Sequence, residues 1–466
     1  MKKFKFKVPN TYLLIFSLLI LIAALTWIIP GGQYERTVVN GRSVVVQNSF
    51  KYVPNNPQGV FAIFTAPLKG FVEAGLIIGF ILIVGGAFNV LAKTDAINSV
   101  IHKLARAHKT SPLLKSTFIP VLMLMFSLGG ATFGMNEEII PFVLITVPIC
   151  IALGYDSIVG VAIPLVGAHI GFASAFLNPF NVGIAQGIAD VPMYSGIGYR
   201  VISWAISTTV AITFLLYYVK KLSRNSSISP MFAEDNIRRQ NEHFDNIFTD
   251  ERKFTAKHKI ILLTFALSLV VIVIGVSKLD WAIEDIAAVF FVMGIAVGMI
   301  GGLSINEFMK SFLDGAKDFV GTAFIVALAR ATLVISRDGQ IIDTVLYGLS
   351  PFIQSSSPIF ASQKMFIVQA IINFFVHSGS GQAALTMPIM APLSDLAGVS
   401  RQTAILAFQF GEYTNIIIPT SAVTMGALSM AKVPWEKWAK WVLPLMIILF
   451  ILGFILLIPP NLIGWQ

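Results

Sequence analysis

The chain has 466 residues, of which 56% are hydrophobic and only 12% are charged. Soluble domains carry about 25% charged residues, so this composition excludes an ordinary soluble protein and indicates a polytopic membrane protein. The formal net charge of +9 would suit a nucleic-acid partner, but the basic residues lie in short loops between apolar segments, where membrane topology explains them. The one cysteine, Cys150, excludes a disulfide framework and a cysteine metal cluster.

Apolar segments alternate with polar breaks in the first half of the chain. Residues 12–29 form the first span, interpreted as uncleaved because no small-residue cleavage site follows it. Residues 31–58 make a polar loop with a small hairpin, and residues 74–91 form the next span. Two apolar runs, short for spans of about 20 residues, then flank the polar stretch 129–138. We therefore predict a re-entrant helical hairpin over residues 113–153.

A helix that is broken in its middle is predicted over residues 156–190. Asn178, Pro179 and Asn181 interrupt this otherwise hydrophobic stretch. Proline has no N–H to donate, and the carbonyls that it frees need partners in hydrocarbon. Such a break survives where it is buried in protein or lines a wet cavity, and broken helices near the midplane hold the binding sites of many secondary transporters.

A hydrophilic linker at residues 220–259, expected in the cytoplasm, divides the chain into two halves, 1–219 and 260–466. The second half opens with one additional span and then repeats the elements of the first half in the same order. Its re-entrant hairpin is expected at residues 365–397 and its broken helix at residues 401–431.

Short matches at a near-constant offset indicate an internal repeat. Ser174-Ala-Phe-Leu-Asn-Pro179 matches Thr414-Asn-Ile-Ile-Ile-Pro419, and Val191-Pro-Met matches Val433-Pro-Trp. Because the additional span reverses the second half, we predict an all-α polytopic membrane protein built from two inverted repeats. Lysine and arginine are more frequent in the loops on the N-terminal side, which predicts a cytoplasmic N-terminus and an outside C-terminus in the plasma membrane.

The four polar breaks are expected to converge near the midplane and to form a substrate site. Helix N-termini there can accept a carboxylate, and amide, hydroxyl and carboxylate side chains can bind polar groups or Na⁺. The predicted substrate-binding residues are Thr132, Asn136, Glu137, Asn178, Asn181, Ser378, Ser380, Gln382, Glu412, Thr414, Asn415, Thr420 and Ser421. A coupling Na⁺ would lie near Asn178 and Asn415, with H⁺ as the other coupling ion, and no other cofactor is expected.

Structural roles compete with these functional ones. The asparagines of the two breaks can simply satisfy backbone groups that the prolines free. Glu137 and Glu412 are costly to place in a bilayer and are functional candidates by default. A glutamate of the first hairpin could instead pair with Arg330. His169 and His377 could relay protons or be satisfied core residues.

Four motifs resemble those of the YfcC-type basic amino acid antiporters, which are related to the anaerobic dicarboxylate carriers of the ion transporter superfamily. These motifs are Gly134-Met-Asn-Glu-Glu-Ile-Ile-Pro141, Asn178-Pro-Phe-Asn181, His377-Ser-Gly-Ser-Gly-Gln382 and Gly411-Glu-Tyr-Thr-Asn415. The resemblance implies two inverted repeats, a homodimer, and an elevator-type mobile unit that carries both hairpins. Dicarboxylate members carry Ser-Asn-Thr at both hairpin tips. This chain has Glu137 at one tip and Ser-Gly-Ser at the other, which puts a dicarboxylate substrate in doubt.

The sequence and the resemblance together predict a secondary transporter of amino acids that works by alternating access. Glu137 and Glu412 suit a cationic side chain, so antiport of basic amino acids, such as arginine for ornithine, is favoured. The same acids could instead carry coupling protons. The alternative is a Na⁺- or H⁺-coupled carrier of four-carbon dicarboxylates or other organic acids. A membrane-embedded enzyme is disfavoured because no metal-spaced cluster or nucleophile–base motif appears, and a sensor would leave two matched hairpins unexplained.

Overall fold

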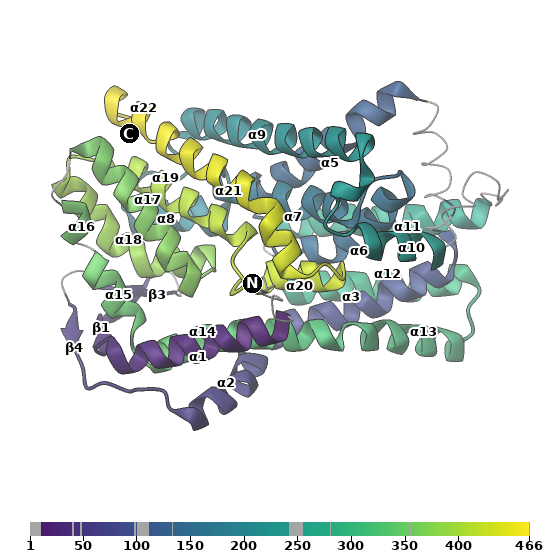
Figure 1. Ribbon diagram of the computed structural model, residues 1–466, viewed down its shortest axis with the longest axis horizontal. Coiled ribbons are helices and arrows are strands. Elements are labelled where there is room, and N and C mark those ends of the chain that lie inside the picture. Colours follow the sequence, from purple (N-terminus) through teal and green to yellow (C-terminus); the bar gives the residue numbers. More distant parts are fainter. Residues whose placement is uncertain are drawn as a thin grey trace, which may run out of the picture.

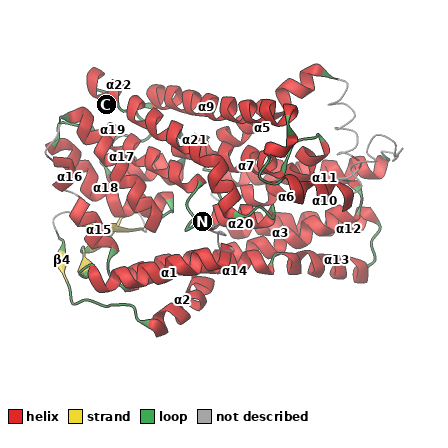
Figure 2. Ribbon diagram, viewed as in Figure 1, coloured by secondary structure: helices red, strands yellow, loops and turns green. Residues whose placement is uncertain are grey.

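The computed structural model describes residues 11–39, 42–46, 49–96, 99, 111–132, 134–241, 255–279, 281–349, 351–354 and 357–465. Helices make up most of this part of the chain, and the few strands lie at one end of the elongated molecule (Figure 2). Seven of the described helices are long and apolar enough to cross a membrane.

The helices of the first half and the linker follow the predicted order. They are α1 (Thr11–Ile28), α2 (Val60–Glu73), α3 (Gly75–Lys93), α5 (Pro112–Thr132), α6 (Ile139–Ala152), α7 (Ser157–Ala173), the π-helix η1 (Pro179–Gly183), α8 (Ile184–Ile188), α9 (Ile197–Arg224), the 3₁₀-helix η2 (Ser226–Ile228) and α10 (Phe232–Asn241).

The second half contains the corresponding elements. They are α11 (Ala256–Lys278), α12 (Ile283–Gly301), α13 (Ile305–Asp318), α14 (Val320–Asp338), α15 (Ile342–Leu349), α16 (Pro351–Gln354), α17 (Pro358–Phe375), α18 (Gly379–Leu396), α19 (Arg401–Gly411), the 3₁₀-helix η4 (Glu412–Ile416), α20 (Ala422–Met430), α21 (Trp435–Leu456) and α22 (Ile458–Ile463).

The first arm of each hairpin is longer than predicted. The apolar runs indicated arms too short to span, whereas α5 has 21 residues and α17 has 18. Both helices continue beyond the apolar run, α5 through Gly129–Thr132 and α17 from Pro358 onward. Apolarity alone therefore underestimated the arms, because a helix can continue through glycine and polar residues on either side of its apolar run.

The buried centre of the molecule is α7. Every residue of this helix is buried, and it packs between α5 and α6 (Figure 1). A Cβ at Gly171 would lie 1.9 Å from the carbonyl oxygen of Ser127, and one at Gly160 would lie 2.5 Å from the Cα of Val147. The two glycines therefore allow the close backbone approach that holds both arms of the first hairpin against the broken helix.

A second close approach joins α2 to α14. A Cβ at Gly70 would lie 2.3 Å from the carbonyl oxygen of Ala327 and 2.8 Å from the backbone nitrogen of Ala331. The helices α1 and α14 run side by side along the same edge of the molecule, where α2 also packs (Figure 1). This packing fixes the last residue of α2, Glu73, beside the polar face of α14.

The loop after α1 contains the predicted hairpin. Strand β2 (Arg36–Val39) pairs antiparallel with β3 (Arg42–Val45), and β1 (Gly32–Gln33) pairs with β4 (Lys51–Tyr52). Asp343 of α15 accepts a 2.9 Å hydrogen bond from the backbone nitrogen of Tyr34 and forms a 2.8 Å ion pair with Arg36. The loop is thus held against the second half of the chain.

The hydrophilic linker is more structured than predicted. Its described residues include the end of α9, η2, α10 and the start of α11, and α10 contacts the ends of both broken helices. The carboxylate of Asp235 accepts from the backbone nitrogen of Ser157 at 2.7 Å and from its hydroxyl, while Arg238 donates to the carbonyl oxygen of Ala431 at 2.7 Å. Residues 242–254 of the linker lie outside the described residues.

The start of each broken helix lies beside the end of the other. Arg238 bridges Ser157 at the start of α7 to Ala431 just after α20. At the opposite end, Arg401 at the start of α19 donates a 2.8 Å hydrogen bond to the carbonyl oxygen of Ala189, just after α8. The two broken helices therefore run side by side in opposite directions.

Candidate substrate-binding site

Both helix breaks occur where the sequence predicts them. The first leaves the helix after Ala173 and resumes as η1 at Pro179, and the second changes to 3₁₀ geometry at Glu412 and resumes as α20 at Ala422. The Ser421 hydroxyl caps α20 by accepting a 3.3 Å hydrogen bond from the backbone nitrogen of Thr424. The polar side chains Asn178, Asn181 and Glu412 of the breaks are buried in protein, whereas the apolar side chains of Leu177 and Phe180 in the first break are exposed.

Asn178 shapes the first break. Its side-chain oxygen accepts hydrogen bonds from the backbone nitrogens of Phe180 at 2.9 Å and Asn181 at 3.2 Å. Its side-chain nitrogen donates to the carbonyl oxygen of Gly130 in the first hairpin at 3.2 Å. These bonds use both lone pairs of the side-chain oxygen and one of the two N–H donors, so the geometry favours the structural role of Asn178 over ligand binding.

The second break is tied to the second hairpin in a similar way. Asn373 donates hydrogen bonds to Thr414 Oγ1 at 2.6 Å and to Asn415 Oδ1 at 3.0 Å, and Thr420 donates to the carbonyl oxygen of Phe374 at 2.8 Å. These predicted site residues therefore brace α17 against the break.

Three further predicted residues make contacts within their own hairpins. Gln382 donates hydrogen bonds to the Gln369 carbonyl oxygen at 2.9 Å and to its side-chain oxygen at 2.8 Å. Ser378 caps α18, and the Thr132 hydroxyl donates to the carbonyl oxygen of Leu128 at 2.6 Å. In the part of the chain that the structure describes, no group of three His, Cys, Asp or Glu side chains is placed to hold a metal ion.

Asn181 and Glu412 connect the two breaks. The Asn181 amide donates to one carboxylate oxygen of Glu412, which is only 1% exposed. The other carboxylate oxygen and the side-chain oxygen of Asn181 have no hydrogen-bond partner among the described residues. A Cβ at Gly379 would lie 2.8 Å from that unpartnered carboxylate oxygen, so the tip of the second hairpin passes directly over Glu412.

A cavity of 380 Å³ lies between the two hairpin tips, within the roughly 300–1,000 Å³ range of small-ligand sites. It brings together four of the predicted residues, Asn136, Glu137, Ser378 and Ser380. Glu412 lies behind the cavity wall that Gly379 helps to form. The predicted residues that do not line the cavity are Thr132, Asn178, Asn181, Gln382, Glu412, Thr414, Asn415, Thr420 and Ser421.

One protein family matches almost the whole chain. The family described as C4-dicarboxylate anaerobic carrier, DcuC, matches residues 8–460 of the chain. The chain belongs to this family. With seven helices able to cross a membrane in its described part, this carrier is a multi-pass membrane protein, and its family is a family of transporters.

Two bacterial relatives of the carrier match over almost the full length. The chain is 34% identical to "Putative basic amino acid antiporter YfcC" of Escherichia coli (strain K12), covering 99% of this chain and 98% of that protein. It is 29% identical to an uncharacterized protein of Haemophilus influenzae, covering 98% and 97% of the two chains. These matches confirm the resemblance that the four motifs predict.

Two solved transporter structures also match nearly the whole carrier. The Alcanivorax borkumensis YdaH transporter has a TM-score of 0.42 and 14% identity, with 98% of this chain and 99% of that chain covered. Neisseria gonorrhoeae MtrF, described with a class of antimetabolite efflux pumps, has a TM-score of 0.40 and 16% identity, with 97% and 95% covered.

The carrier's central cavity also contains charged residues that were not among the predicted site residues. Glu73 from the end of α2 and Arg330 from α14 line it, together with His377 and Glu138. A pairing of Arg330 with a glutamate of the first hairpin was one alternative that the sequence left open, but its Nε lies 3.4 Å from a carboxylate oxygen of Glu73 instead. That pairing was missed because only the close packing of α2 on α14 brings the two residues together.

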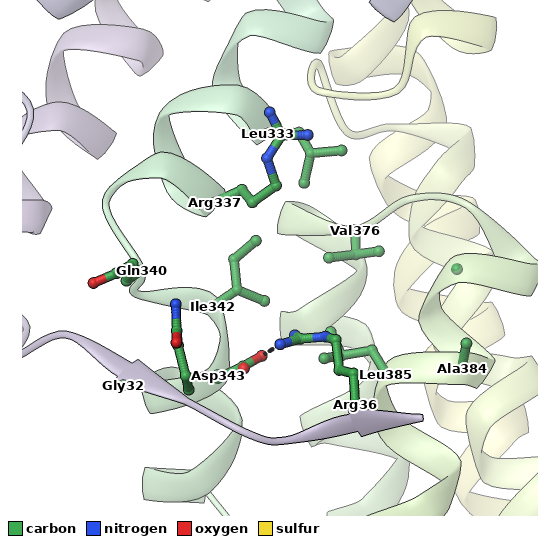
Figure 3. A pocket seen from close by; sticks show the side chains of 12 residues that line it. Gly32, Arg36, Leu333, Arg337, Gln340, Ile342, Asp343, Val376, Ala384 and Leu385 are labelled. Atoms are coloured by element: carbon green, nitrogen blue, oxygen red, sulfur yellow. Dashed lines mark hydrogen bonds and ion pairs between the residues drawn. The ribbon is translucent and has the colours of Figure 1, made fainter. Parts of the chain in front are cut away.

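A second cavity of 460 Å³, the vestibule, lies against the second hairpin and the loop that contains Gly32 and Arg36 (Figure 3). The ion pair of Arg36 and Asp343 closes one side of it, and Ala384 and Leu385 of α18 line another. Residues 377–380 of the second hairpin line the central cavity, whereas Val376 and Gly381 on either side of them line the vestibule. The tip of the second hairpin therefore stands between the two cavities.

Proposed function

We propose that this carrier exchanges basic amino acids across the plasma membrane and binds them in the central cavity. The observation that carries the proposal is the charge of the cavity wall. Glu73, Glu137 and Glu138 line it, against Arg330 as the one lysine or arginine among its described lining residues. An excess of carboxylates complements a substrate with a net positive charge, such as arginine, ornithine or lysine.

The printed name of the Escherichia coli relative supports a basic amino acid as the substrate. The family description names C4-dicarboxylates, so a Na⁺- or H⁺-coupled carrier of four-carbon dicarboxylates is the second candidate. Arg330 is the observation that favours this candidate, because a dicarboxylate site needs cationic groups. Against it stand three carboxylates that would repel a doubly negative substrate.

Transport would proceed by alternating access of the two hairpins around the cavity. The opposite directions of the broken helices support two inverted repeats, and the resemblance to elevator carriers supports a homodimer with a mobile hairpin-bearing unit. The loop charges support a cytoplasmic N-terminus and an outside C-terminus. Glu412, buried without a cationic partner among the described residues, is the candidate for a coupling H⁺ or Na⁺.

Exchange in liposomes tests the proposal. Purified protein is reconstituted into vesicles preloaded with ornithine, and labelled arginine or labelled succinate is added outside. We expect arginine uptake that depends on internal ornithine and no uptake of succinate. Uptake of succinate without arginine would establish the dicarboxylate alternative. Absence of flux with either compound would contradict transport of both classes and favour a sensor or an enzyme.

A further inference from the structure

We propose that Arg330 binds the carboxylate group of the transported amino acid and so orients it in the central cavity. The assignment rests on the proposed function. It adds a carboxylate-binding residue on α14, outside both hairpins and both helix breaks.

Arg330 lies on the wall of the central cavity. Its side chain lines the central cavity and is 30% exposed, although it lies in the middle of α14. A positive charge at that depth is costly in a membrane protein, and such residues face a cavity or a partner. Arg330 faces the same cavity that Glu137 and Glu138 line from the first hairpin.

The guanidinium of Arg330 has few partners within the protein. No described residue forms a hydrogen bond with Arg330, and its one charged contact is the 3.4 Å approach of Nε to Glu73. The other carboxylate oxygen of Glu73 is held at 2.6 Å by Arg337, which lines the vestibule. Glu73 is therefore shared between two arginines and holds Arg330 more loosely than Arg337.

The shape of a guanidinium suits it to bind a carboxylate. A guanidinium presents a planar set of donors that matches a carboxylate and binds it through two parallel hydrogen bonds. Nε of Arg330 lies 3.4 Å from Glu73 without forming a hydrogen bond, so the donors of the guanidinium remain for such a pair. Glu73 acts as a positioning residue, because its carboxylate attracts the guanidinium without satisfying it.

The charges around the cavity then define how the substrate lies. A basic amino acid carries one carboxylate and two cationic groups, and the cavity presents one guanidinium on α14 and two carboxylates at the first hairpin tip. The carboxylate of the substrate would lie toward α14, and its amino or guanidinium group toward Glu137 and Glu138. Recognition of the carboxylate would let the carrier distinguish an amino acid from the corresponding amine.

Competition with a decarboxylated analogue tests the assignment. Agmatine is arginine without its carboxylate. In the liposome exchange assay, and in binding to the full-length protein in detergent, we expect arginine to compete at least about tenfold better than agmatine for the wild type. Arg330→Gln should weaken arginine about tenfold or more while changing agmatine little, and Arg330→Lys should recover part of the difference.

Lys69→Gln is the matched control. Lys69 also forms an ion pair between α2 and α14, with Asp338 at 2.7 Å, but lines neither cavity. It should retain the wild-type ratio of arginine to agmatine affinity. Wild-type binding of arginine together with an unchanged ratio in Arg330→Gln would overturn the assignment alone. Absence of arginine binding and exchange in the wild type would overturn the proposed function and the assignment with it.

Discussion

The Asn181 amide donates a hydrogen bond to the Glu412 carboxylate and joins two helix breaks that lie 231 residues apart in the chain. The contact is fully buried, and no lysine or arginine among the described residues forms an ion pair with Glu412. An unpaired carboxylate in such a place is retained at a cost in stability. We attribute the retention of this carboxylate to a role in transport, because Glu412 lies directly behind the tip of the second hairpin.

Replacement of Glu412 tests this explanation. Glu412→Gln keeps the size of the side chain and an acceptor for Asn181 but removes the charge. We expect exchange to fall about 10- to 100-fold, the range of a lost charge-assisted hydrogen bond, while the protein remains folded. The measurement is arginine exchange in liposomes, with size-exclusion chromatography to establish folding. Glu436→Gln in the first turn of α21, outside both cavities, is the control and should exchange normally. Normal kinetics in Glu412→Gln would remove the proposed role of its charge.

The contact between the second hairpin and Glu412 leads to a second prediction. A Cβ at Gly379 would lie 2.8 Å from the Glu412 carboxylate and 2.8 Å from the ring of Phe172. Gly379→Ala should therefore push the hairpin tip away from the break and lower exchange about tenfold, equivalent to ~1.4 kcal/mol. Gly348→Ala, where a Cβ would meet nothing within 4 Å, should exchange like the wild type. Equal rates in the two variants would show that the hairpin tip tolerates displacement.

The packing of α2 on α14 gives a third prediction. A Cβ at Gly70 would lie 2.3 Å from the carbonyl oxygen of Ala327, which is too close for two such atoms. Because this oxygen belongs to the backbone of α14, one of the two helices would have to shift. Gly70→Ala should cost about 1–3 kcal/mol, as overpacking of a core does. It should also weaken substrate binding, because Glu73 moves away from Arg330. Thermal unfolding in detergent measures the first effect. Gly75→Ala is the control, since a Cβ there is unobstructed, and a larger loss in the control would contradict the packing argument.

The docking of the linker helix gives a fourth prediction. Asp235 is buried and accepts from both the backbone nitrogen and the hydroxyl of Ser157. Asp235→Asn replaces one of the two acceptor oxygens with a donor NH₂ group, so one of the two bonds from Ser157 is lost, and it should lower the free energy of unfolding by about 1–3 kcal/mol. Glu234→Gln breaks the neighbouring, partly exposed ion pair with Lys437 and should cost less than about 1 kcal/mol. The order of the two unfolding temperatures checks the prediction, and the reverse order would show that α10 is held chiefly by the exposed pair.

Hydrophobic patterning and proline predicted the order of the apolar helices and the two breaks, but not the full length of the hairpin arms or the helix α10 in the linker. Asn178-Pro179 marks the first break correctly because its cause is local: Pro179 has no N–H to donate, and the Asn178 side-chain oxygen accepts from the backbone nitrogens of Phe180 and Asn181. The hairpin tips were also predicted from their glycines and polar residues. Asn136, Glu137, Ser378 and Ser380 accordingly line the cavity.

Side-chain partners could not be predicted in the same way, because they depend on packing between distant helices. Glu73 ends an unremarkable amphipathic segment, and only the glycine contact of α2 with α14 brings it to Arg330. Arg200 follows a short polar loop, yet it is fully buried and donates to the side-chain oxygens of Gln402 at 2.8 Å and of Gln409. Likewise, Thr414 and Asn415 are polar residues of the kind that bind substrates. In the structure they accept hydrogen bonds from Asn373 and so hold the second break to α17.

The bond between Asn181 and Glu412 also has a consequence for biosynthesis. A chain is made from its N-terminus, and its early segments fold before the later ones are available. The first hairpin and the first break can therefore assemble while Asn181 still lacks Glu412, its partner 231 residues later. The polar interior of the newly made first half stays incomplete until the second break inserts. In a chain that stops before residue 412, the Asn181 amide would keep its 3.3 Å bond to the carbonyl oxygen of Phe172 but would lack the acceptor that Glu412 supplies to its other N–H.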